Sequence, residues 1–279
     1  MKASYELVSC HLKSFIKHTW TTTVPYACLM ACTVYFALPN KPLHDWGLLN
    51  PWLSFILQTL VYGATIIMSF VAGASVWGWI NHKPFKKNIR PYALLSLILL
   101  VLQYIPMGIF SRFQNSIMAI AHKGDAKGTL IVFGSMALLL IVILMLSLPF
   151  CYAIPKRMLL EEGEKMQYKK AFLAGLRHSG GFFTTGFLGV MILLILTVIV
   201  CIPSCIIIIA QLYSQLGALE GDSLGVPSYF TPLLLVVLAV TCFIEIYLTY
   251  WLTIAFAYQY GSYKVQDEEK LRLKQNNLE

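Results

Sequence analysis

The chain has 279 residues, of which 58% are hydrophobic and only 12% are charged, and its formal net charge is +8. A soluble domain carries about a quarter charged residues, so this composition excludes an ordinary soluble protein and predicts an integral membrane protein. The basic residues are dispersed among the segments between apolar runs, which argues against a nucleic-acid-binding surface. We expect one all-α membrane domain over residues 1–260 and a polar tail over residues 261–279.

Six apolar runs, taken in chain order, predict six transmembrane helices. They cover residues 21–38, 52–79, 92–110, 129–154, 181–213 and 230–260. Two amphipathic segments, residues 2–18 and 163–178, precede the first and the fifth run and are expected to lie at the membrane surface. In the second of these segments Tyr168, Phe172 and Leu176 recur every four residues, which predicts a helix.

The distribution of Lys and Arg predicts how the chain crosses the membrane. Of the 21 Lys and Arg residues, 17 lie in the N-terminal segment, in the connectors after the second and fourth runs, and in the tail. Basic residues of short loops accumulate on the cytoplasmic side. Both termini are therefore expected in the cytoplasm.

The two basic connectors offer candidate contacts to anionic phospholipid headgroups. The side chains concerned are Lys86, Lys87, Arg90, Lys169, Lys170 and Arg177. A basic rim of this kind occurs in many membrane proteins and by itself reports topology only. Lipid binding would follow if the charges converged on one site.

One segment ahead of the fifth run carries a resemblance to known proteins. Residues 171–178 read AFLAGLRH, which fits the pattern AFxxGxxH. Together with the layout of six spans, this segment resembles bacterial inner-membrane families of poorly defined role, among them the membrane domain found ahead of some glycerophosphodiester phosphodiesterases. The resemblance implies a multi-pass protein of the bacterial cytoplasmic (inner) membrane and transfers no catalytic residue.

Catalytic and metal-binding motifs are missing from the sequence. It contains no HExxH, GxxxxGK[ST] or GxSxG, and no two histidines are three or four residues apart. All cysteines but Cys10 lie in or beside apolar runs, where a thiol behaves as a small hydrophobe. The acidic clusters Glu161–Glu164 and Asp267–Glu269 are interpreted as solvated charges balanced by nearby Lys and Arg. We therefore predict no catalytic residue, no metal site and no cofactor, and not an enzyme.

Glu245 stands out because it lies near the middle of the last apolar run. An ionisable side chain at such depth is costly unless it is paired, protonated or in contact with water, so it marks a candidate functional site. Thr241, Thr249 and Thr253 are spaced from it by multiples of four residues and extend a polar stripe along the same helix face. This stripe is expected to face the interior of the helix bundle.

No Lys, Arg or His lies within the apolar runs at a similar depth to pair with Glu245. Apolar surroundings without a cation favour the neutral acid. We expect a protonated Glu245 that donates a hydrogen bond to a partner such as Gln103, with Thr197 and Ser135 as other candidates at similar depth.

Two functions remain open for this chain. The first is a solute-handling or transport-accessory role centred on Glu245, assisted by Thr241, Thr249 and Gln103. The second is a structural or lipid-interacting subunit of a membrane complex, in which Glu245 makes only an interhelical hydrogen bond. The partners expected are the lipid bilayer, anionic phospholipid, and a second copy or another membrane subunit, but no nucleic acid.

Overall fold

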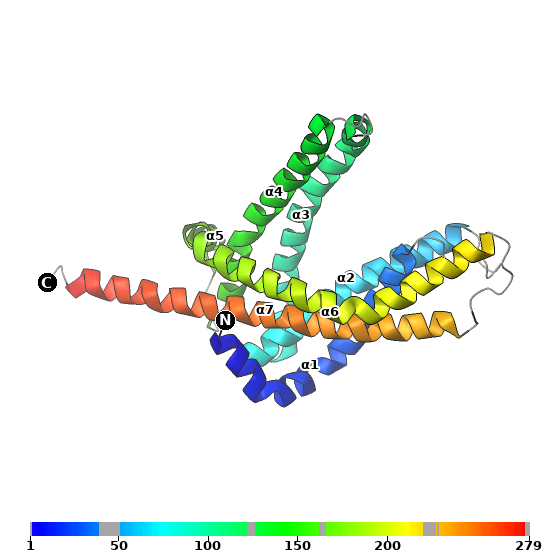
Figure 1. Cartoon of the computed structure of the whole chain (residues 1–279). Helices are drawn as coiled ribbons and strands as arrows, with labels where there is room; N and C mark the ends of the chain where they lie inside the picture. The colour runs from blue at the N-terminus through cyan, green and yellow to red at the C-terminus, as the bar shows by residue number, and fades with distance from the viewer. Residues whose placement is uncertain are drawn as a thin grey trace. The chain divides into compact units, whose positions relative to one another are not determined.

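A computed structural model describes residues 2–38, 51–121, 126–161, 164, 166–219, 227 and 229–276. Every regular element among these residues is an α-helix (Figure 1). The helices are α1 (Lys2–Ala37), α2 (Pro51–Asn81), α3 (Phe85–Ala121), α4 (Ala126–Met158), α5 (Tyr168–Arg177), α6 (Ser179–Leu219) and α7 (Phe230–Asn276). The predicted all-α class is confirmed for this part of the chain. Glu162 of the first acidic cluster and the last three residues of the tail lie outside it.

Five helices, α2, α3, α4, α6 and α7, are long and apolar enough to cross a membrane, as judged by length and composition. Long apolar segments become helices because a bilayer offers no hydrogen-bond partner to an open backbone. The five segments are Phe55–Asn81, Phe85–Gly108, Gly134–Met158, Ser179–Ser214 and Phe230–Lys270. They overlap the last five of the predicted runs. The first predicted span lies in α1, which is not among these five segments, and it stays a prediction.

The outer faces of these helices are apolar. On α6, for example, Ile195, Val198, Ile202 and Ile206 are exposed. A soluble protein rarely exposes contiguous apolar surface on this scale, whereas a membrane helix presents such side chains to lipid. The pattern of exposure therefore agrees with the span assignment.

The chain divides into two compact units, and α6 and α7 contribute to both. The first unit comprises Met1–Phe85 and Phe187–Ile254. Its core is formed by α1, α2 and α7, with Phe15, Ala31, Ala72, Leu238 and Ile254 among the buried side chains. This unit holds Glu245.

Hydroxyl pairs fix the rotation of α7 against α1 within the first unit. The Thr19 hydroxyl donates to the Phe15 carbonyl at 2.8 Å, so it must accept the bond of 3.0 Å that joins it to the Tyr247 hydroxyl. Thr23 likewise donates to the Thr19 carbonyl at 2.9 Å and lies 3.2 Å from the Tyr250 hydroxyl. At 3.6 residues per turn, Tyr250 projects about 180° away from residue 241. The opposite face of α7 is thereby turned toward α6.

The second unit comprises Lys86–Gly186 and Ala255–Glu279. The helices α3 and α4 run antiparallel and side by side in Figure 1, and Gln103 Nε2 donates to Ser147 Oγ between them at 3.0 Å. Near the end of α4, the buried side chains of Leu148, Tyr152, Phe182 and Tyr260 form the core of this unit. The predicted amphipathic helix ahead of the fifth run is present as α5 and packs on α4.

Candidate functional site

The carboxyl group of Glu245 lies between α7 and α6. Thr197 Oγ1 of α6 donates a hydrogen bond of 2.8 Å to Glu245 Oε2. The other oxygen, Oε1, is buried, and no residue in the described part of the chain is hydrogen-bonded to it. The side chain is therefore held through one oxygen while the second keeps its full capacity to bind a proton or a cation.

A second polar pair joins the same two helices. Ser204 Oγ of α6 lies 2.7 Å from Thr241 Oγ1 of α7, and both side chains are buried. The thiols of Cys201 on α6 and Cys242 on α7 lie near Glu245. This set of six side chains, which we call the α6–α7 seam, contains no basic residue.

The predicted threonine stripe on α7 is divided by the structure. Thr241 faces α6 and belongs to the seam, as just described. The hydroxyl of Thr249 donates instead to the Glu245 carbonyl at 2.9 Å, and the hydroxyl of Thr253 donates to the Thr249 carbonyl at 3.3 Å. Such bonds to the preceding helical turn are the usual way in which a threonine satisfies its hydroxyl within a helix. The seam thus contains Thr241 but receives no hydroxyl donor from Thr249 or Thr253.

Of the side chains expected as partners of Glu245, Thr197 makes the hydrogen bond. Gln103 belongs to the second unit, where its amide donates to Ser147. The sequence places several polar residues at a comparable depth, but depth alone does not say which of them faces α7. That choice depends on the rotation of each helix, which distant contacts such as Thr19 with Tyr247 determine.

The predicted lipid contacts are exposed on two helices. Lys86, Lys87 and Arg90 lie in the first two turns of α3, while Lys169, Lys170 and Arg177 lie on α5. Both groups belong to the second unit. The structure thus assigns each set of three cations to a single helix.

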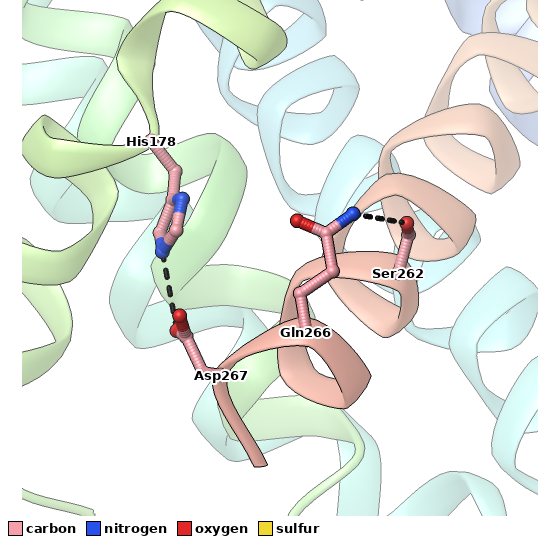
Figure 2. Close-up of polar contacts among 4 residues, drawn as sticks. All are labelled: His178, Ser262, Gln266 and Asp267. Carbon is pink, nitrogen blue, oxygen red and sulfur yellow. Dashed lines mark hydrogen bonds and ion pairs between the residues drawn. The ribbon is translucent and has the colours of Figure 1, made fainter. Parts of the chain in front are cut away.

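A histidine–aspartate pair in the second unit was not predicted. His178 Nε2 lies 3.2 Å from Asp267 Oδ2, as Figure 2 shows. The imidazole ring stacks on Tyr263 at 4.3 Å between centroids and on Tyr152 at 6.0 Å. Asp267, interpreted from the sequence as a solvated charge, is 37% exposed and contacts this histidine, while its neighbour Glu268 pairs with a basic residue, Lys264, at 3.9 Å.

No sequence signal could have found this pair, because its two members are 89 residues apart. His178 is the last residue of the AFxxGxxH pattern. The structure shows what the other residues of this pattern do. Ala171 is fully buried, Phe172 meets the ring of Phe150 edge-on, and Gly175 lies against the backbone of Pro149. The pattern describes a packing module built on α4.

Among the described residues, no three or more His, Cys, Asp or Glu side chains are grouped so that they could hold a metal ion. Comparison of the chain with protein-family models, with curated proteins and with solved structures yields no match.

Proposed function

We propose that the protein handles a solute within the membrane and that Glu245 is the group that binds it, as a proton or a cation, at the α6–α7 seam. One observation carries the proposal. The carboxyl group is fixed by Thr197 through Oε2, while Oε1 is buried without a hydrogen-bond partner among the described residues. An acid in this position gains most from a proton or a positive charge placed at Oε1.

A purely structural role explains this arrangement less well. A hydrogen bond between membrane helices contributes about 0.6 kcal/mol on average, and a neutral amide or hydroxyl provides it without the cost of burying an ionisable group. The Ser204–Thr241 pair already joins α6 to α7 with two neutral hydroxyls. The packing of α6 against α7 therefore does not require an ionisable carboxyl group.

The proposal includes a topology of six spans with both termini in the cytoplasm of a bacterial cell. The first span is residues 21–38 of α1, and the helix is kinked before it at His11, where φ is −113° and ψ is 17°. The kink lies within the amphipathic N-terminal segment, ahead of the part that would cross the membrane. The charge distribution, with 17 of 21 Lys and Arg on one side, supports the same orientation.

Six spans make a small carrier, so the proposal also includes assembly, either with a second copy or with another membrane subunit. The alternation of access that transport requires usually involves movement of one helix bundle against another. A single small bundle provides such a movement more readily within an assembly.

Carbodiimide modification tests the binding role of Glu245, because a hydrophobic carbodiimide reacts with protonated carboxyl groups in apolar surroundings. We expect the reagent to modify Glu245 in membranes and the modification to fall as the pH rises, since the ionised carboxylate does not react. Peptide mass spectrometry measures the modified fraction, and the Glu245→Gln variant identifies the background. A Glu245 that stays unmodified in membranes at every pH, but reacts in the unfolded protein, would contradict the proposal.

A further inference from the structure

The helix α5 is held on α4 by small side chains, which fixes the direction in which its other residues point. Ala171 is fully buried, and a Cβ atom added at Gly175 would lie 2.8 Å from the carbonyl oxygen of Pro149. Ala171 and Gly175 are four residues apart and so occupy one face of the helix. That face packs on α4, and Phe172 also meets the ring of Phe150, whereas most of the other side chains of α5 are exposed.

The exposed side chains of α5 are both apolar and basic. Tyr168, Leu173 and Leu176, three of the four large apolar residues of the helix, are exposed to 53%, 55% and 45%. Three cations, Lys169, Lys170 and Arg177, are exposed beside them, and α5 contains no acidic residue. None of the three cations forms an ion pair with another residue in the described part of the chain. An exposed apolar sector flanked by cations is the pattern of a helix that lies in a membrane interface.

The position of α5 along α4 agrees with a location in the membrane interface. Pro149, against which Gly175 packs, belongs to the candidate span Gly134–Met158, and the next candidate span begins at Ser179, directly after α5. Lys156 lies seven residues beyond Pro149, or about 10 Å further along the helix axis. A helix at the level of Pro149 is therefore about 10 Å deeper than the basic end of α4. Interfacial helices bury their apolar face about 5–10 Å into the boundary between headgroups and acyl chains.

We propose that the exposed face of α5 is a binding site for anionic phospholipid, in which Lys169, Lys170 and Arg177 contact the headgroup phosphates and Tyr168, Leu173 and Leu176 contact the acyl chains. The charge and the apolar sector favour a lipid over a protein partner, because a bilayer necessarily surrounds the spans on either side of α5. Rigid attachment to α4 means that the cations are presented at one depth, which a flexible basic loop would not achieve. The site is independent of Glu245 and of its role.

The test compares lipid binding by the full-length protein in zwitterionic detergent micelles. Phosphatidylglycerol is titrated into the protein and the bound lipid is counted by native mass spectrometry, with phosphatidylcholine as the reference lipid. The variant Lys169→Gln/Lys170→Gln/Arg177→Gln removes the three cations of α5. The control Lys264→Gln/Lys270→Gln/Arg272→Gln removes the same charge from the exposed end of α7. Melting temperatures in phosphatidylcholine micelles show that both variants are folded.

We expect the wild type and the α7 control to prefer phosphatidylglycerol and the α5 variant to bind it on the order of 100-fold more weakly, because each of the three cations contributes about a factor of five near the membrane surface. The variant Leu173→Gln keeps the charges and is expected to lose affinity for both lipids.

Equal losses in the α5 and α7 variants would overturn the proposal, since the preference would then follow net charge alone. An unchanged affinity in the α5 variant, or retention of a protein partner in place of lipid, would overturn it as well. If the triple variant does not fold, the single change Lys170→Gln serves in its place, with an expected loss of about fivefold.

Discussion

Glu245 and Thr197 define the site at the scale of single residues, and the energy of their contact can be measured. In a double-mutant cycle with Glu245→Met, which removes the acceptor, and Thr197→Val, which removes the donor, we expect a coupling energy of about 0.6 kcal/mol and not more than about 1.7 kcal/mol, as for other interhelical hydrogen bonds in membranes. The measurement is the free energy of unfolding in mixed micelles. A coupling energy of zero would show that the 2.8 Å bond is not formed.

A separate variant, Glu245→Gln, distinguishes the binding role from the structural one. Glu245→Gln keeps the size and the hydrogen-bond acceptor. If the role is structural, a variant as stable as the wild type should therefore move protons or cations at nearly the wild-type rate. A binding role predicts a loss of activity at full stability, because an amide cannot take up a proton or pair with a cation.

The pair His178 and Asp267 gives a second prediction at this scale. Asp267→Asn is expected to lower the free energy of unfolding by less than about 1 kcal/mol, because the aspartate side chain is 37% exposed and its interaction is screened by solvent. His178→Ala is expected to cost more, since it also removes the stacking on Tyr152 and Tyr263. Equal losses for the two variants, measured by thermal unfolding, would contradict this order.

Single residues also show where prediction from sequence ends. The candidate Glu245 follows from the sequence because a carboxyl group in the middle of an apolar run is visible without any contact being known. Its partner Thr197 was one of several candidates, because the choice depends on how α6 and α7 are rotated. His178 and Asp267 stayed hidden for the same reason: their contact is long-range, and each residue has an ordinary local sequence.

At the scale of elements, α5 depends on the close approach of Gly175 to α4. Gly175→Ala is expected to destabilise the protein by about 1–3 kcal/mol, because the added methyl group meets the Pro149 backbone, which cannot move aside as a side chain would. The matched control is Gly180→Ala, where a Cβ atom has nothing within 4 Å. That variant should be neutral or slightly stabilising. The difference in unfolding free energy between the two variants is the measurement, and equal values would contradict the packing described.

The helix α5 itself was predicted, but its orientation was not. The recurrence of Tyr168, Phe172 and Leu176 indicates an amphipathic helix, and such a stripe normally marks the buried face. In the structure the buried face is formed by Ala171 and Gly175, while Tyr168 and Leu176 are exposed. Hydrophobic periodicity does not separate a face that packs on protein from a face that meets lipid, because both are apolar.

At the scale of the whole molecule, the proposed topology is tested by fusions at the C-terminus. A fluorescent protein fused after residue 279 is expected to fluoresce in bacterial cells, and alkaline phosphatase at the same place is expected to be inactive, because the first requires the cytoplasm and the second the periplasm. The opposite pair of results would contradict cytoplasmic termini. An odd number of spans, with α1 lying outside the membrane, would be the simplest explanation of that outcome.

The helices α3 and α7 extend beyond the predicted apolar runs, α7 as far as Asn276. The presence of these helices could be predicted because apolar runs of this length have few alternatives to a helix in a bilayer. The division into two compact units could not. It depends on which parts of α6 and α7 pack with which other helices, and a uniformly apolar helix carries little information about its neighbours. The polar contacts that specify the packing are few: Thr19 with Tyr247, for example, identifies α1 as a neighbour of α7.

The most direct test of the account is proton movement by the purified protein in liposomes. With an inside-negative potassium diffusion potential and a pH-sensitive dye inside, we expect wild-type vesicles to acidify faster than protein-free vesicles. Glu245→Gln should return the rate to that of protein-free vesicles. The control Thr59→Val, which removes a hydroxyl bonded only within α2, should keep the wild-type rate. A Glu245→Gln variant with unchanged rate and unchanged stability would contradict the central claim, and a wild type no faster than empty vesicles would exclude a proton as the bound species.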